Sequence, residues 1–131
     1  MGGNFVKGVG SAGVIPSSKH FIMNEQEANR EASSSSGGGG GGGIPGGSPP
    51  TIFSMISAKQ SSNSTIKNGV AGAMCTMNKV NGTYSCENQD LLGKYLKVEL
   101  GMPGIVHSDV GAQHTSINST NAGMDYGSSS D

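Results

Sequence analysis

The sequence predicts an α/β fold with parallel strands, and three observations lead to that prediction. Short apolar runs at 70–75 and 105–108 lie on either side of a stretch with helical periodicity, giving the order strand, helix, strand. The first of these runs is nearly all apolar, as in a strand covered on both faces of a parallel sheet. A further helix-then-strand segment precedes both runs, at 5–22.

The composition limits what this small chain can bind. Its 131 residues are 33% apolar and 13% charged, with 23 glycines and no tryptophan, so the apolar stock for a core is thin. The net charge of −1 offers no basic surplus for nucleic-acid binding. No apolar run approaches the ~18 residues of a membrane span. The N-terminus has no signal-peptide pattern, and nothing in the sequence indicates an oligomeric state.

The chain is predicted to have three parts, at 1–32, 33–50 and 51–131. The middle part combines four serines, seven consecutive glycines and a Pro/Gly-rich end. Such a segment cannot bury enough apolar area to offset its ordering entropy, so we expect a disordered linker. The flanking parts contain the predicted helices and strands, but they make up only a few strands of a sheet with open edges, so we expect the isolated chain to fold poorly or to aggregate.

In the first part, apolar residues at helical spacing predict a helix over 5–9, which Gly10 and Gly13 would end. An extended run from 14 to 22 follows. The glycines of 8–13 match the G-x-G-x-x-G pattern, but the helix comes before them rather than after. A dinucleotide site needs the opposite order, so we read a turn and expect no cofactor.

In the last part, Asn81-Gly82 predicts a tight turn. Asn88 can cap the helix that follows, and Gly101 can end it in a left-handed conformation. The apolar stripe of this helix consists of Leu91, Leu92, Tyr95, Leu96 and Leu100. A strand over 105–108 completes a βαβ unit.

Polar side chains follow directly after the apolar runs. Lys19 and His20 follow the apolar residues at 14–16, and Ser108 and Asp109 follow those at 105–106. Side chains at the carboxyl ends of parallel strands converge on one rim, where active sites of such folds lie. An Asp, a Lys and a His there would suit a hydroxyl-rich substrate, with Asp109 as nucleophile or base.

Each of these residues also has a structural interpretation. Asp109 could cap a following helix, because Asp is a favoured N-cap. Lys19 could be a solvated surface lysine, and His20 a hydrogen-bonded structural histidine. His107 points to the opposite face from Ser108, which suggests a structural or exposed role. Ser108 lacks the G-x-S-x-G pattern of serine hydrolases.

Cys75 and Cys86 are expected to form a disulfide around the Asn81-Gly82 turn. Their spacing does not fit a C-x-x-C motif, no second pair is present, and no metal site is expected. Three N-x-[ST] sequons predict glycosylation at Asn63, Asn81 and Asn118.

Several segments together resemble glycoside hydrolase family 3, in particular its secreted fungal β-glucosidases. The matching motifs are SAGVI (11–15), KHFIMNEQE (19–27), GVAGAMC (69–75), NKVNGTYSCEN (78–88), ELG (99–101), SD (108–109), GAQHT (111–115) and AGMD (122–125). They occur in the family's order, and the resemblance extends over about two thirds of the chain, everything but the linker and its flanks.

The resemblance implies an incomplete (β/α)8 TIM-type barrel and retaining hydrolysis of β-glucosides or cello-oligosaccharides. It implies that Asp109 is the nucleophile and that Lys19, His20 and Met74 bind the sugar. The two cysteines match a pair that is bridged in fungal members. Secretion is implied as well. The general-acid Glu and the early barrel strands of the family have no counterpart in this chain.

Two departures from the family pattern stand near the expected site. Met77 replaces a usual tyrosine, and Val110 replaces the tryptophan that usually follows the nucleophile. Both changes remove aromatic contact with a sugar. Two other hypotheses therefore stay open, namely a sugar-binding remnant without catalysis and a non-functional fragment.

Overall fold

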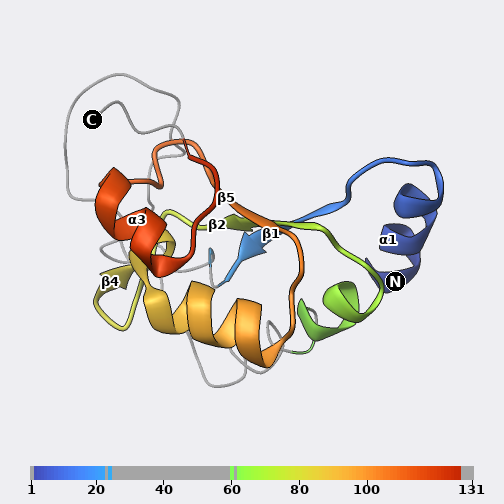
Figure 1. Cartoon of the computed structure of the whole chain (residues 1–131), viewed down its shortest axis with the longest axis horizontal. Helices are drawn as coiled ribbons and strands as arrows, with labels where there is room; N and C mark the ends of the chain where they lie inside the picture. Colours follow the sequence, from blue (N-terminus) through green and yellow to red (C-terminus); the bar gives the residue numbers. More distant parts are fainter. Residues whose placement is uncertain (1, 23, 25–59, 61, 128–131) are drawn as a thin grey trace.

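The structure, a computed structural model, describes residues 2–22, 24, 60 and 62–127 (Figure 1). The predicted linker at 33–50 lies outside the described residues. The elements are α1 (Gly2–Ser11), β1 (Ser17–Phe21), β2 (Gly72–Cys75), β3 (Lys79–Val80), β4 (Thr83–Tyr84), η1 (Ser85–Glu87), η2 (Asp90–Glu99), β5 (Ile105–Ser108) and α3 (Ser116–Ala122). No helix of the described part is long and apolar enough to cross a membrane.

The prediction of a parallel α/β sheet is confirmed. Its strands have the order β1-β2-β5, and both pairings are parallel. Residues 72–75 of β2 pair in unbroken register with 105–108 of β5. Beyond β5, Tyr126 forms a single parallel bridge with His107. All three strands therefore end on the same side, which brings Phe21, Cys75 and Ser108 together.

The helix of the βαβ unit covers one face of the sheet (Figure 1). Leu92 and Leu96 of η2 are almost fully buried, as are Ala73 and Val106 on the strands. Met74 and His107, which alternate with these strand residues, keep intermediate exposure, and Ile105 is 50% exposed. The prediction that 70–75 is covered on both faces is therefore confirmed for the η2 face only.

The turns follow the predicted glycine and asparagine positions. Asn81 and Gly82 have φ values of 52° and 83°, which gives the β3–β4 hairpin the left-handed turn that its twist favours. Asn88 Oδ1 accepts the Leu91 N–H at 3.1 Å and so caps η2. Gly101 has a φ of 65°, directly after the helix.

Two features of η2 and α1 differ in detail from expectation. At the end of η2, the Leu100 N–H donates to the Tyr95 carbonyl five residues earlier, which is π-type bonding. Helix α1 continues through Gly10 to Ser11, and only Gly13, with a φ of 75°, reverses the chain. Val14 and Ile15 of the expected extended run are exposed rather than part of β1.

Candidate active site

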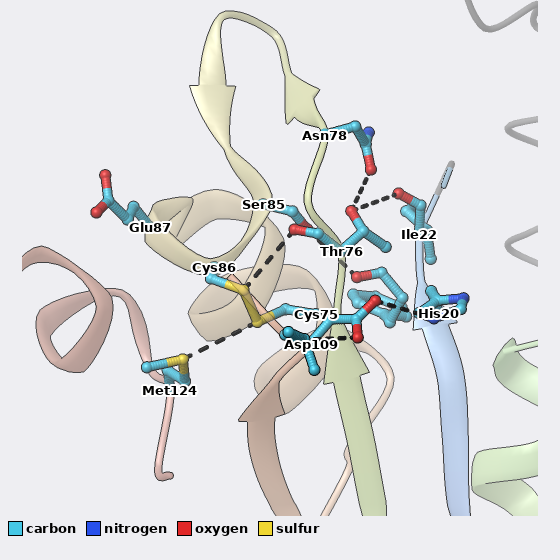
Figure 2. The surroundings of a disulfide bond; sticks show 12 residues. His20, Ile22, Cys75, Thr76, Asn78, Ser85, Cys86, Glu87, Asp109 and Met124 are labelled. Carbon is cyan, nitrogen blue, oxygen red and sulfur yellow. Dashed lines mark hydrogen bonds and ion pairs between the residues drawn. A yellow bond between two sulfur atoms is a disulfide. The ribbon is translucent and has the colours of Figure 1, made fainter. Parts of the chain in front are cut away.

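The carboxyl ends of β1 and β5 bring His20 and Asp109 together across the end of β2 (Figure 2). His20 Nε2 lies 3.1 Å from Asp109 Oδ2. The side chains are 26% and 17% exposed, so they are largely covered and still open to a small molecule. The structure thus joins two residues that sequence reasoning had placed on one rim.

Asp109 does not cap a helix, so that structural interpretation is wrong. Its Oδ1 accepts the N–H of the next residue, Val110, at 2.8 Å. Its own N–H donates to the Cys75 carbonyl, and its carbonyl accepts the Ala112 N–H. A turn follows, and the next helix, α3, begins only at Ser116. The carboxylate is therefore oriented by β2, by its own turn and by His20.

His20 is held from both ring nitrogens. Nδ1 lies 3.3 Å from Nδ2 of Asn24, which can only donate. Nδ1 therefore accepts a hydrogen bond from Asn24. In the neutral ring Nε2 then carries the proton, and this N–H donates a hydrogen bond to Asp109. The imidazole plane is fixed by two partners, which fits the structural interpretation of His20 as well as a role at the site.

Two buried hydroxyls lie against the end of β1. Ser85 Oγ donates to the Phe21 carbonyl at 3.3 Å. Thr76 Oγ1 donates its one proton to Asn78 Oδ1 and lies 3.5 Å from the Ile22 carbonyl, and all three polar side chains are fully buried. Their signal in the sequence was weak, because isolated Thr, Ser and Asn residues are usually exposed.

The disulfide between Cys75 and Cys86 joins the end of β2 to η1 directly beneath this rim. Both cysteines are fully buried, and the Met124 sulfur lies 4.0 Å from Cys75 Sγ. In Figure 2 the disulfide lies between Asp109 on one side and Glu87 on the other.

Tyr95 of η2 packs against Phe21, the last residue of β1. Its ring stacks on Phe21 with centroids 6.3 Å apart. Burial and, second, the nearby Glu99 carboxylate raise the pKa of the Tyr95 phenol above its ordinary value. The phenol therefore stays neutral at physiological pH.

The other predicted site residues differ from the His20–Asp109 pair in exposure and partners. Lys19 is exposed on β1, and Met74 is half-buried on β2. His107 pairs with Ser17 instead (Nε2 to Oγ 2.8 Å), which fits its structural interpretation. Of the described residues, no three His, Cys, Asp or Glu side chains are grouped so as to hold a metal ion.

The three sequon asparagines differ in their surroundings. Asn81 is exposed at the tip of the β3–β4 hairpin, and Asn118 is exposed on α3. Asn63 is half-buried in a helical stretch over 62–67.

Comparison with known proteins gives a consistent answer. No family model matches the chain. The chain is 45% identical to probable β-glucosidase D of Aspergillus flavus over 95% of its own length and 16% of that protein. It is 46% identical to probable β-glucosidase D of Aspergillus niger, over 95% of the chain and 17% of the relative.

Solved structures agree with these relatives. The β-D-glucoside glucohydrolase of Trichoderma reesei superimposes with a TM-score of 0.76 at 37% identity, over 96% of this chain and 16% of that one. The glycoside hydrolase family 3 β-glucosidase of Neurospora crassa gives a TM-score of 0.74 at 28% identity, with 96% and 15% covered. The chain is thus similar to one segment of these β-glucosidases.

One further similar structure is a complex with glucose. β-Glucosidase 3B of Thermotoga neapolitana, in complex with glucose, has a TM-score of 0.71 at 28% identity, over 95% of this chain and 16% of that one. The present chain spans about 16% of the length of the β-glucosidases that it matches. The segment that it shares with them carries the His20–Asp109 pair.

Proposed function

We propose that this segment supplies the nucleophile side of a β-glucosidase active site, with Asp109 as the nucleophile. The observation that carries the proposal is the contact between Asp109 and His20 at the carboxyl ends of parallel strands. The relatives are β-glucosidases, and one neighbour binds glucose. The substrate class that follows is a β-glucoside or a cello-oligosaccharide.

The sheet is proposed to be part of a (β/α)8 barrel. Its strands are parallel, η2 covers one face, and the other face carries Met74, Ile105 and His107 in partly exposed positions. In a closed barrel this second face would point inward and be filled by side chains from other strands. The single bridge from Tyr126 to His107 marks where the next strand would pair. The parts 1–32 and 51–131 would then be two pieces of the same barrel.

The proposed reaction is a retaining double displacement. An Asp109 carboxylate oxygen forms a bond to the anomeric carbon while the bond from that carbon to the leaving oxygen breaks. An acid outside this segment protonates the leaving oxygen. Water, deprotonated by the same group, then attacks the anomeric carbon, which returns the electron pair of the glycosyl ester to Asp109. The sugar leaves with its original anomeric configuration.

The remaining side chains are assigned to the sugar. The His20 ring and the Lys19 ammonium would donate hydrogen bonds to sugar hydroxyls, and Met74 would contact an apolar sugar face. Because His20 already donates to Asp109, binding of a sugar would share or replace that bond. This couples occupancy of the sugar site to the orientation of the nucleophile.

The disulfide and the sequons suggest an oxidising, secretory environment. Cys75 and Cys86 are bonded, and Asn81 lies at an exposed hairpin tip where a glycan would be accommodated. Asn63 and Asn118 are proposed as further glycosylation sites.

Covalent trapping tests the proposal without the missing acid. 2,4-Dinitrophenyl 2-deoxy-2-fluoro-β-glucoside has a leaving group that departs unprotonated, and its fluorine slows breakdown of the glycosyl ester. We expect a fluoroglucosyl adduct on the peptide that contains Asp109, found by mass spectrometry. Asp109→Asn should abolish labelling, and the exposed control Asp90→Asn should keep it.

Two outcomes would contradict the catalytic proposal. Labelling at another carboxylate would assign the nucleophile elsewhere. Saturable glucose binding without any label would favour the sugar-binding alternative, provided that Lys19→Ala and His20→Ala weaken it.

A further inference from the structure

The loop that carries Asp109, residues 109–115, is held at both ends by the segment around the disulfide. At its start, the Asp109 N–H donates to the Cys75 carbonyl at 3.3 Å. At its end, the N–H and the hydroxyl of Thr115 both donate to Oε1 of Glu87, at 2.8 and 2.9 Å. Glu87 directly follows Cys86, the partner of Cys75. The two anchors of the loop are therefore joined covalently through the disulfide.

Glu87 is itself attached to rigid structure on both sides. Cys86, before it, is fully buried and bonded to β2. Asn88, after it, caps η2 through Oδ1 and donates from Nδ2 to the Val80 carbonyl at 3.1 Å. A carboxylate oxygen that accepts two hydrogen bonds makes them charge-assisted, which is the stronger class. Glu87 is thus a fixed acceptor for Thr115 rather than a freely moving surface side chain.

A ring contact reinforces the same end of the loop. The His114 ring stacks on Tyr84 of β4 with centroids 3.5 Å apart and an interplanar angle of 24°. Lys79 Nζ lies 4.6 Å from the centroid of the Tyr84 ring. The last two residues of the loop therefore both contact the β3–η1 segment.

Movement of the loop end would reach Asp109 through a short path. The Ala112 N–H donates to the Asp109 carbonyl at 3.1 Å, and Gly111, with a φ of 70°, turns the chain between them. Val110, whose N–H orients the Asp109 carboxylate, is 74% exposed and gains little from packing. The carboxylate orientation thus depends on how the loop is held at its ends.

We propose that Glu87 is a positioning residue that holds the 109–115 loop and thereby keeps Asp109 against His20. The inference rests on the proposed function only for the statement that Asp109 is the nucleophile. Its structural part, the dependence of the His20–Asp109 contact on Glu87, stands by itself and is tested without turnover.

Chemical modification of histidine provides that test on the full chain. Diethyl pyrocarbonate acylates unprotonated imidazole nitrogens, and peptide mass spectrometry follows each histidine separately at low protein concentration. In Glu87→Ala we expect His20 to react about ten-fold faster, the factor that corresponds to loss of one charge-assisted hydrogen bond. His107, whose partner is Ser17, is the internal reference and should not change.

Three variants complete the design. Glu87→Gln keeps an acceptor oxygen and should restore most of the slow reaction of His20. Glu99→Ala, which removes an exposed carboxylate from η2, is the matched control and should resemble the wild type. If Glu87→Ala unfolds and all three histidines react alike, Thr115→Val, which removes only the hydroxyl donor, takes its place and should accelerate His20 several-fold.

The outcomes separate this inference from the proposed function. Unchanged His20 reactivity in a folded Glu87→Ala or Thr115→Val variant overturns the positioning role, whatever the glycosidic activity. Accelerated His20 reactivity together with no covalent labelling of Asp109 in the wild type supports the positioning role and removes the nucleophile assignment. If Glu87 positions Asp109 and Asp109 is also the nucleophile, Glu87→Ala should slow fluoroglucosyl labelling of Asp109 more than it weakens glucose binding.

Discussion

Nε2 of His20 and Oδ2 of Asp109 lie 3.1 Å apart, although His20 is on β1 and Asp109 directly follows β5, the other outer strand. Strand β2 separates these strands, so the side chains meet beyond its end rather than along it. The contact needs a parallel sheet, because only parallel strands bring both carboxyl ends to one edge. It is also the most specific geometric support for the proposed active site.

Removal of the proposed nucleophile should allow chemical rescue. We expect Asp109→Gly to lower hydrolysis of 2,4-dinitrophenyl β-glucoside by at least about a thousand-fold, as loss of a nucleophile does. Azide, entering the space of the carboxylate, should restore release of dinitrophenolate and give the α-glucosyl azide. NMR of the product reads its anomeric configuration. A β-configured azide would contradict the assignment, because Asp109 would then not occupy the face of attack.

An aromatic side chain at position 110 should strengthen sugar binding. Val110 is 74% exposed beside Asp109, so Val110→Trp can be accommodated without displacing core atoms. Stacking on a sugar face is expected to add about 1 kcal/mol, or roughly five-fold in glucose affinity. Isothermal titration of glucose measures it, with Val98→Trp on the exposed face of η2 as control. Equal affinity in both variants would place the sugar away from Val110.

The turn into β5 should not tolerate a side chain at position 104. A Cβ on Gly104 would overlap the carbonyl and Cα of Ala71, which are backbone atoms and cannot rotate away. We expect Gly104→Ala to lower the free energy of unfolding by more than about 2 kcal/mol. Gly10→Ala, in α1 with open space around the new Cβ, should raise it by about 0.5–1 kcal/mol. Urea unfolding compares the two, and similar stabilities would contradict the close approach.

The disulfide should contribute measurably to stability. Cys75→Ser combined with Cys86→Ser is expected to cost roughly 2–3 kcal/mol, mainly because the unfolded chain gains freedom. Since both cysteines are fully buried, dithiothreitol should reduce the native protein only after it opens. Urea unfolding and thiol titration measure these effects. Rapid reduction without denaturant would show that the bond is accessible.

Tyr95 should make the fold less stable in alkali. Its pKa is raised above the ordinary value of 10.0, by burial first and by Glu99 second. The unfolded chain therefore ionises first, so the contribution of Tyr95 is complete below about pH 10 and is lost as the pH rises further. Ultraviolet titration of the phenolate should show one late tyrosine, absent in Tyr95→Phe. A stability curve equally steep in Tyr95→Phe would assign the alkaline loss to other groups.

Local signals in the sequence were sufficient for most of the elements. The Asn81-Gly82 turn, the Asn88 cap and the leucine stripe of η2 all lie where predicted, because each depends on neighbours within a few residues. The coverage of β2 was less predictable. Its apolar run cannot show whether the second face meets protein or solvent, and Met74 is only half-buried.

For the candidate site, too, local signals identified residues but not their contacts. Lys19, His20 and Asp109 were selected because polar residues follow apolar runs, and the motifs in which they stand pointed to family 3 β-glucosidases. The sequence could not show which of these side chains would contact one another, because Asp109 could equally have capped a helix and Lys19 could equally have been a surface lysine. Ser85 and Glu87 gave no periodic or spacing signal, because their partners, the Phe21 carbonyl and Thr115, are distant in sequence.

The sequence by itself determined the α/β class, the order of α1, β1, β2, η2 and β5, and the family resemblance, because these depend on local periodicity, turn residues and short motifs. Only the tertiary structure decided that His20 contacts Asp109, that buried hydroxyls lie against the end of β1, and that Glu87 anchors the loop after the proposed nucleophile. Those relationships depend on the parallel register of β1, β2 and β5 and on the path of the disulfide. Both are set by packing among distant segments, which no local pattern specifies.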